Sequence, residues 1–158
     1  MTSIRPARST DLSALLAMGL LMTREAPWLS EDEVDEDLLR EHLEAVVSGG
    51  GGYYPLGATA LIYEDTKPQG AILGVIAPEQ PWIVPLCVHE LALWVRPEAR
   101  RRGVGRQLIR ALEAWGYDRG CDGARMGAGS GVLHEKTVAL YESEGYSLCG
   151  QTLRKDLR

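Results

Sequence analysis

The stretch that most constrains the fold is a turn rich in arginine and glycine, RPEARRRGVGRQLIR at residues 96–110. It follows the apolar run PLCVHELALWV, which is typical of a long strand, and Pro97 ends that strand. Beyond Gly105, apolar residues recur at helical spacing, namely Leu108, Ile109, Leu112 and Trp115. The sequence therefore predicts a strand, a tight turn and a helix in immediate succession.

The chemistry of this turn favours an anion. A helix N-terminus offers unpaired N–H groups and a partial positive charge. Glycine lets the backbone approach a ligand closely, and arginine adds permanently charged, planar donors that suit phosphate. The turn is predicted to hold an anion, in particular a pyrophosphate. A solvated basic loop with a glycine turn is the alternative that these residues leave open.

Single residues exclude other familiar motifs. A dinucleotide fingerprint requires a third glycine where Leu108 stands, and the Gly-Lys-Ser/Thr of a Walker loop is missing. In GAGSGV, residues 127–132, Ala128 and Val132 break the Gly-x-Ser-x-Gly pattern of a nucleophile elbow. We therefore expect no Rossmann, P-loop or α/β-hydrolase site.

Periodicity and capping residues predict the other elements of the chain. Helices are expected after Ser9–Asp11, from about Val34, after Gly105, and over HEKTVALYESEG, where Gly145 ends the helix. Strands are expected at 3–7, 58–65, 70–77, 85–95, 122–128, 146–150 and 151–157. The order β-α-α-β-β-β-α-β-α-β-β predicts one domain over residues 1–158, of α+β or mixed α/β class, around one sheet.

Composition limits the cellular location and the kinds of partner expected for this protein. The 158 residues are enough to bury a core, and no apolar run approaches the roughly 20 residues that cross a bilayer. The start of the chain has no apolar leader, and three widely spaced cysteines are typical of reduced thiols. The net charge of −5 argues against nucleic acid. We expect a cytoplasmic protein without a membrane partner, a nucleic-acid partner or a metal site.

Two motifs together carry a family resemblance. VRPEARRRGVGRQLI resembles the acetyl-CoA motif Arg/Gln-x-x-Gly-x-Gly/Ala of the GNAT N-acetyltransferase superfamily, with Arg100, Gly103 and Gly105 in its fixed places. Downstream, ALYESEGY at residues 139–146 resembles the second signature of the family, and IRPARSTDL resembles its start. The resemblance covers nearly the whole chain. It implies a mostly antiparallel sheet of six to seven strands, splayed at the middle strands and flanked by about four helices.

The resemblance implies acetyl transfer from acetyl-CoA to an amine of a small-molecule or peptide acceptor, by direct attack in a ternary complex. A sensor or interaction module that binds acetyl-CoA without turnover is the alternative, and a homodimer is left open. His134 stands where family members often carry an asparagine that contacts the cofactor. The residues that the resemblance places on acetyl-CoA are Leu93, Trp94, Val95, Arg100, Arg101, Arg102, Gly103, Val104, Gly105, Arg106 and His134. The side chains of Arg96 and Arg110 are expected to be solvated instead.

Acetyl transfer needs a base for the ammonium, a donor for the thioester oxygen and a proton for the departing thiolate. By resemblance, a backbone amide of the central strand is the donor and Tyr141 occupies the general-acid position. Glu90 is the preferred base, and in a regular strand it would share a face with Ala92 and Trp94. His89, the alternative base, would lie on the opposite face, and a β-bulge would exchange the faces of Glu90 and His89. A water-borne base remains a third possibility.

The run EDEVDED at residues 31–37 holds six acids. Acids at a helix N-terminus interact favourably with the helix dipole, so a solvated helix start is the default interpretation. Alternatively, the run attracts a cationic acceptor, because GNAT acceptors usually bind near the first two helices. Trp28, just before the run, would then be a wall of the acceptor pocket, and otherwise a packing residue. The identity of the acceptor is left open by the sequence.

Overall fold

The computed structural model describes residues 3–30 and 33–157. Its helices are α1 (Leu12–Glu25), α2 (Glu36–Val47), α3 (Val104–Tyr117) and α4 (His134–Ser143). Its strands are β1 (Ser3–Pro6), β2 (Ala58–Glu64), β3 (Pro68–Pro78), β4 (Leu86–Val95) and β5 (Gly123–Arg125). None of the helices formed by these residues is long and apolar enough to cross a bilayer.

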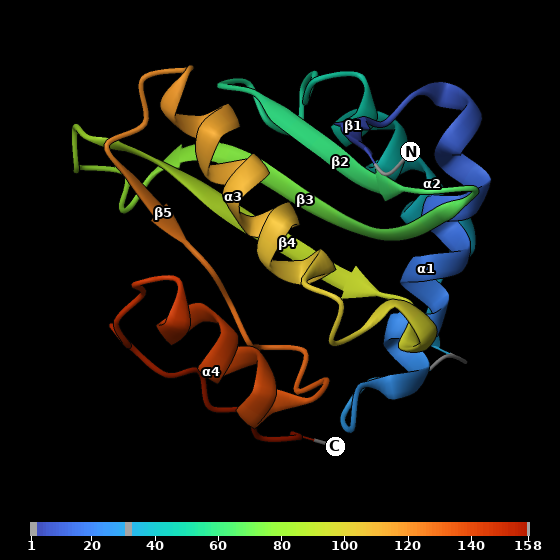
Figure 1. The fold of residues 1–158 in the computed structure, drawn as a ribbon. Helices are drawn as coiled ribbons and strands as arrows, with labels where there is room; N and C mark the ends of the chain where they lie inside the picture. Colours follow the sequence, from blue (N-terminus) through green and yellow to red (C-terminus); the bar gives the residue numbers. More distant parts are fainter. Residues whose placement is uncertain (1–2, 31–32, 158) are drawn as a thin grey trace.

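The strands form one mixed sheet in the order β1-β2-β3-β4-β5. The pairs β1–β2, β2–β3 and β3–β4 are antiparallel, whereas β4 and β5 are parallel. Residues 58–65 and 70–77, which were expected as strands, are confirmed as β2 and β3 and pair as an antiparallel hairpin. Helices α1 and α2 cover one face of the sheet, and α3 crosses the other face (Figure 1). The domain is therefore a three-layer α+β structure around one sheet.

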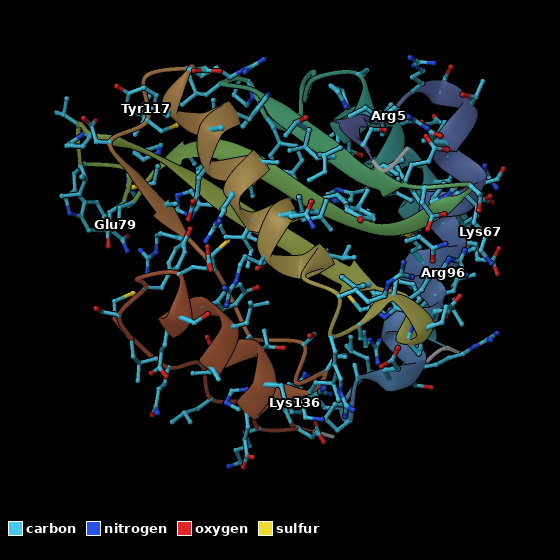
Figure 2. All side chains as sticks on the ribbon, viewed as in Figure 1. Arg5, Lys67, Glu79, Arg96, Tyr117 and Lys136 are labelled. Carbon is cyan, nitrogen blue, oxygen red and sulfur yellow. The ribbon has the colours of Figure 1, made fainter. Side chains whose placement is uncertain are left out.

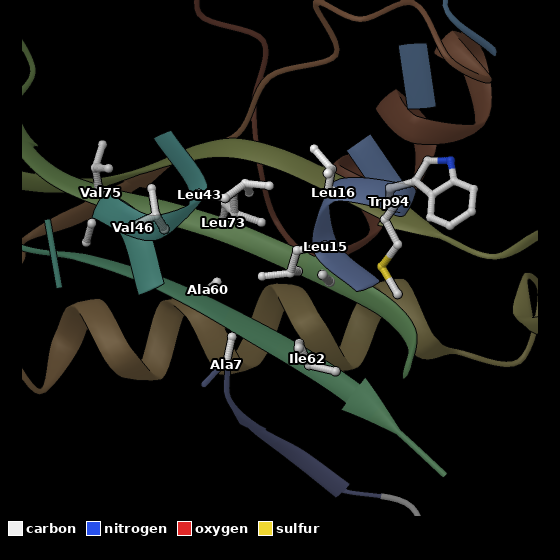
Figure 3. Packing of buried hydrophobic residues seen from close by; sticks show 13 residues of the cluster. Ala7, Leu15, Leu16, Leu43, Val46, Ala60, Ile62, Leu73, Val75 and Trp94 are labelled. Atoms are coloured by element: carbon white, nitrogen blue, oxygen red, sulfur yellow. The ribbon is translucent and has the colours of Figure 1, made fainter. Parts of the chain in front are cut away.

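Each face of the sheet buries its own cluster of apolar side chains. On the α1 and α2 side, Leu15 and Leu43 pack with alternate residues of β2 and β3 and with Trp94 (Figure 3). On the other side, the apolar stripe of α3 packs on Val88 and Ile72. The stripe approaches so closely that a Cβ on Gly74 would collide with Leu112. The helical spacing seen in the sequence thus corresponds to the buried face of α3.

The expectation of six to seven strands is wrong for the described residues, which form five. Residues 146–150 and 151–157, expected as two strands, have no regular secondary structure, and Leu148, Leu153 and Leu157 are exposed. A short alternation of apolar and polar residues becomes a strand only when a neighbouring strand pairs with it and one face is buried. Here β5 pairs only with β4, so neither condition is met for these segments.

A β-bulge in β4 decides which side chains face which helices. Gly74 pairs with Glu90 and Leu73 with Ala92, so Leu91 is an extra residue without a partner on β3. Beyond the bulge the alternation is shifted by one residue. Val88, Leu93 and Val95 therefore belong to the cluster under α3, while Trp94 packs on the α1 side. The expectation that Glu90 shares a face with Ala92 and Trp94, made for a regular strand, is wrong.

Candidate active site

A cleft opens where β4 and β5 separate. The two strands pair only at Cys87–Gly123, Val88–Ala124 and His89–Arg125, after which β5 turns away from β4 (Figure 1). The cleft has a volume of about 1090 Å³. Its walls are the free part of β4, the start of α3, and the loop 127–133 with the inner face of α4. The sheet is thus splayed, as the resemblance implies, but between β4 and the edge strand β5 and not between middle strands.

The cleft brings together most of the site residues predicted from the sequence. From β4 these are Glu90, Leu93, Trp94 and Val95, and from α4 Tyr141. From the turn and the start of α3 they are Arg100, Arg101, Gly103, Val104, Gly105 and Arg106. Arg102 and His134 are exposed and do not line the cleft, and a ring nitrogen of His134 lies 3.4 Å from the carbonyl oxygen of Ala128.

The N-terminus of α3 forms a cradle of backbone N–H groups beside open space. Gly103 precedes the helix with φ +77°, a conformation that favours glycine. The N–H of Gln107 donates to the carbonyl oxygen of Gly103 at 3.1 Å and is the first intrahelical donor, so the N–H groups of Val104, Gly105 and Arg106 have no acceptor within the helix. A Cβ on Gly103 would meet only the side-chain nitrogen of Gln107, at 3.9 Å. The space beside this turn is therefore open to a ligand.

Gly105 has a different task from Gly103. A Cβ on Gly105 would lie 3.2 Å from the side chain of Leu140, which is on α4. The glycine therefore allows α4 to pack close to the start of α3. The two glycines of the motif serve separate purposes, because one faces open space and the other faces a neighbouring helix.

Most of the arginines around the turn have partners within the protein. Arg100 donates to the carbonyl oxygen of Val95 at 2.9 Å and to Glu25 at 2.7 Å. Arg106 and Arg110 both pair with Glu144, at 2.8 and 2.7 Å. Arg96 donates to the carbonyl oxygen of Pro68 at 2.9 Å. Arg96 is half-buried, so the expectation that its side chain is solvated is wrong, whereas the side chain of Arg110 is 63% exposed, as expected.

Arg101 and Arg102 differ from these arginines. Both are exposed and make no hydrogen bond or ion pair with the residues that the structure describes. Lys136 on α4 (Figure 2) is also exposed and lines the cleft. The sequence analysis did not single out Lys136. Lys136 precedes Leu140 by one helical turn, so the two side chains lie on the same face of α4. The side chains available to a bound anion are thus two arginines beside the cradle and one lysine opposite.

Glu90 and Tyr141 meet at the backbone of Gly127. The N–H of Gly127 donates to Oε2 of Glu90 at 2.9 Å, and the hydroxyl of Tyr141 lies 3.4 Å from the carbonyl oxygen of Gly127. Burial raises the pKa of Glu90 to about 7, although hydrogen bonds from Gly127 and Tyr141 oppose the shift. Burial first, and then the charge of Glu90, holds the pKa of Tyr141 well above its ordinary value. The cleft thus contains a carboxyl group that titrates near neutral pH beside a phenol that stays protonated.

The bulge places His89, the other candidate base, elsewhere. His89 pairs with Val75 on β3, whose side chain packs in the α1 and α2 cluster. A ring nitrogen of His89 lies 3.3 Å from the carbonyl oxygen of Ala77. Glu90, not His89, therefore shares the cleft with Tyr141.

The acidic run is described only in part, because Glu31 and Asp32 lie outside the described residues. Asp35 accepts hydrogen bonds from the N–H groups of Asp37 and Leu38, each at 3.0 Å, at the start of α2. This is the helix-capping role given as the default interpretation. Trp28 packs against the loop after β5, because a Cβ on Gly131 would collide with its indole ring.

One cleft thus combines a splayed sheet edge, the N-terminus of α3, the exposed cations Arg101 and Lys136, and the carboxyl–phenol pair of Glu90 and Tyr141. The sequence profile of the "Acetyltransferase (GNAT) family" matches residues 20–146. The chain belongs to this family, whose members use acetyl-CoA as the acetyl donor. It is thus an N-acetyltransferase-type enzyme by family. No sequence among the curated proteins is significantly similar to it.

Solved structures share the fold at low sequence identity. A GCN5-related N-acetyltransferase from Ralstonia eutropha JMP134 has a TM-score of 0.74 and 22% identity, over 99% of both chains. A Trypanosoma brucei acetyltransferase has a TM-score of 0.69 and 22% identity, over 99% of this chain and 100% of that one. An aminoglycoside N-acetyltransferase, AAC(6')-Iy, solved with CoA, has a TM-score of 0.74 and 18% identity, over 100% of this chain and 95% of that one. At these identities the likeness shows the fold alone.

The described residues fit acetyl-CoA. A pyrophosphate matches the open N–H groups at the start of α3, and Arg101 and Arg102 are free to contact phosphate. Residues 90–95 of β4 have no partner on the β5 side, so their backbone is available to a ligand that pairs along the strand.

Proposed function

We propose that the chain transfers the acetyl group of acetyl-CoA to the amine of a small-molecule or peptide acceptor, by direct attack in a ternary complex. The observation that carries the proposal is the meeting of Glu90 and Tyr141 at Gly127, in the cleft that also contains the start of α3. Acetyl-CoA supplies an acetyl thioester with an electrophilic carbonyl carbon. The protein supplies position, a base, an acid and a hydrogen-bond donor.

Binding is assigned to two backbone segments. Leu93, Trp94 and Val95 offer their strand edge to the pantetheine arm, and Gly103 to Arg106 offer N–H groups to the pyrophosphate. Arg101, Arg102 and Lys136 are assigned to the phosphates as exposed cations. Arg100 has a positioning role, because its bonds to Val95 and Glu25 hold the end of β4 against α1. His134 is retained only as a contact at the outer margin of the cofactor, since it does not line the cleft.

Glu90 is assigned as the general base. An amine attacks only as the free base, so its ammonium form must first lose a proton. A carboxylate whose pKa is about 7 is a better proton acceptor than an ordinary glutamate and is still largely ionised slightly above neutral pH. Its bond to the N–H of Gly127 holds Oε2 in a fixed position. The position of this carboxylate in the cleft supports Glu90 over a water-borne base.

Tyr141 is assigned as the general acid that protonates the departing thiolate. Its pKa lies well above the ordinary tyrosine value, so the hydroxyl retains its proton at neutral pH until a strong base forms beside it. The protonated Glu90 lies within hydrogen-bonding reach and is a source for the proton that Tyr141 gives up. For the thioester oxygen we assign an N–H of the bulge at Leu91, since the bulge residue has no partner on β3.

The test is release of free thiol from acetyl-CoA in the presence of an amine panel. We expect release to depend on the amine, and mass spectrometry should show the acetylated product. A reaction without amine measures hydrolysis and is the control. Tight binding of acetyl-CoA without any amine-dependent thiol release would contradict the proposal and favour the sensor alternative.

Further features of the protein belong to the same proposal. We propose a cytoplasmic enzyme, supported by three free thiols, without a nucleic-acid partner, supported by the net charge of −5. We also propose a homodimer. Trp82 is 77% and Val84 90% exposed in the turn between β3 and β4, at the end of the molecule marked by Glu79 and Tyr117 (Figure 2). Such an exposed apolar patch is typical of an interface, and analytical ultracentrifugation tests it.

A further inference from the structure

We infer that the acceptor is a small primary amine with one positive charge and an apolar body, such as an alkylamine or arylalkylamine, and not a polyamine or another polycation. The inference rests on the proposed function and concerns the same cleft. Three independent properties of the cleft support it: its charges, its apolar side chains and the closure of its loop side.

The charges of the cleft leave room for one ammonium group. Among the described residues that line it, Glu90 is the only carboxylate. The other charged side chains of this lining are cations, namely Arg100, Arg101, Arg106 and Lys136. A second ammonium on the acceptor would have no carboxylate among the described lining residues as a partner, and the neighbouring Glu25 and Glu144 already pair with arginines. Charge complementarity therefore selects a monocation whose nitrogen lies at Glu90.

Several side chains that line the cleft are apolar and incompletely buried. Leu91, the bulge residue next to Glu90, is 38% exposed, and Leu133 on the opposite wall is 44% exposed. Met22 reaches the cleft from α1, and Val132 lines it beside Leu133. Apolar surface that faces a cleft gains free energy when an apolar ligand covers it, by roughly 25 cal/mol per Å². An acceptor with an apolar body uses this surface, whereas a polyhydroxylated or polyamino compound does not.

The loop side of the cleft is held closed by Trp28. Gly131, with φ +70°, lies between Ser130 and Val132, which both line the cleft, and it packs against the indole ring of Trp28. The guanidinium of Arg154 donates to the carbonyl oxygen of Trp28 at 2.6 Å, which ties the C-terminal segment to the same point. Three segments distant in sequence thus meet at one edge of the cleft. This closure favours a compact acceptor.

The test compares two amines that differ only by a second ammonium, hexylamine and 1,6-diaminohexane. With the wild-type protein and saturating acetyl-CoA, we expect kcat/KM for hexylamine to exceed that for the diamine at least about tenfold, which corresponds to about 1.4 kcal/mol. Spermidine and neamine are included as polycations. Preference for the diamine, for spermidine or for neamine would overturn the inference while leaving the proposed function intact. Absence of thiol release with every amine would overturn the proposed function itself.

A matched pair of variants tests the charge argument directly. Met22→Glu places a second carboxylate on the cleft wall, and Met22→Gln has nearly the same shape without the charge. We expect Met22→Glu to shift the ratio of kcat/KM toward the diamine by about tenfold relative to Met22→Gln. If either variant fails to fold, Leu91→Asp and Leu91→Asn serve as the pair at a more exposed position. An unchanged ratio between the members of a folded pair would overturn the inference.

Discussion

Glu90→Gln is expected to stabilise the protein while it removes the base. The carboxyl of Glu90 has a pKa of about 7 in the folded protein, against an ordinary value of 4.5. Each pKa unit is worth about 1.36 kcal/mol, so burying the ionised carboxylate costs about 2 to 3 kcal/mol. The lower value allows for screening by solvent that reaches part of the carboxyl group. Glutamine is neutral and keeps an oxygen that can accept from the N–H of Gly127. The variant therefore avoids the cost of ionisation.

The pH dependence of this stabilisation follows from the raised pKa of Glu90 in the folded protein. Below about pH 4.5 the carboxyl is protonated in both the folded and the unfolded state, so ionisation contributes nothing to the difference. Between about 4.5 and 7 the unfolded state ionises while the folded state stays protonated, and the stability of the wild type falls. Above about pH 7 both states are ionised and the cost is fully present. The advantage of Glu90→Gln should thus grow through this window and then stay constant.

Urea unfolding at pH 5, 6, 7 and 8 measures the free energy of unfolding of both proteins. Glu142→Gln, an exposed carboxylate on the same helix as Tyr141, is the control. In parallel, kcat/KM of Glu90→Gln should be about 10²- to 10⁴-fold lower near neutral pH, and the rise of the wild-type profile toward pH 7 should be lost. A stability difference that is the same at pH 5 and pH 8 would refute the reasoning, because it would mean that Glu90 does not ionise at a cost.

The remaining predictions concern the cofactor and the proton path. Gly103→Val should weaken acetyl-CoA binding in calorimetry far more than Gly103→Ala, because both share the strain of φ +77° but only valine fills the space beside the turn; equal affinities would contradict the cradle. Tyr141→Phe should lower kcat toward the small end of about 10²- to 10⁴-fold with acetyl-CoA affinity nearly unchanged, and full turnover with rate-limiting chemistry would make Tyr141 a packing residue. His89→Gln should leave the pH–rate profile of kcat/KM unchanged, since His89 faces away from the cleft, and loss of the limb near pH 7 would reassign the base.

The motif residues show what local sequence can predict. A glycine at a helix start, followed by a second glycine two residues later, was sufficient to predict the cradle at Gly103, because that geometry depends on neighbours in the chain. Tyr141 could likewise be placed on a helix of the second signature, and this is confirmed by α4. The roles of these residues remain predictions.

The partners of the arginines could not be predicted in the same way. None of the six arginines was expected to pair within the protein, but Arg96, Arg100, Arg106 and Arg110 have partners as distant as Pro68, Glu25 and Glu144. Only the packing of α1, β3 and the end of α4 around the turn and α3 brings those groups together. The strands expected at 146–150 and 151–157 failed for a related reason, since a strand depends on a neighbour that the local pattern does not contain.

The sequence by itself determined the class of the protein, because two short motifs and the order of elements are local or linear properties of the chain. The tertiary structure alone decided which of two adjacent residues enters the cleft. Glu90 and His89 differ by one position, and the alternation of a regular strand would have placed Glu90 beside Trp94. The bulge at Leu91 arises from how β4 pairs with β3, and it turns Glu90 toward Tyr141. Pairing between strands is a property of two distant segments, so the side-chain period of one of them cannot reveal it.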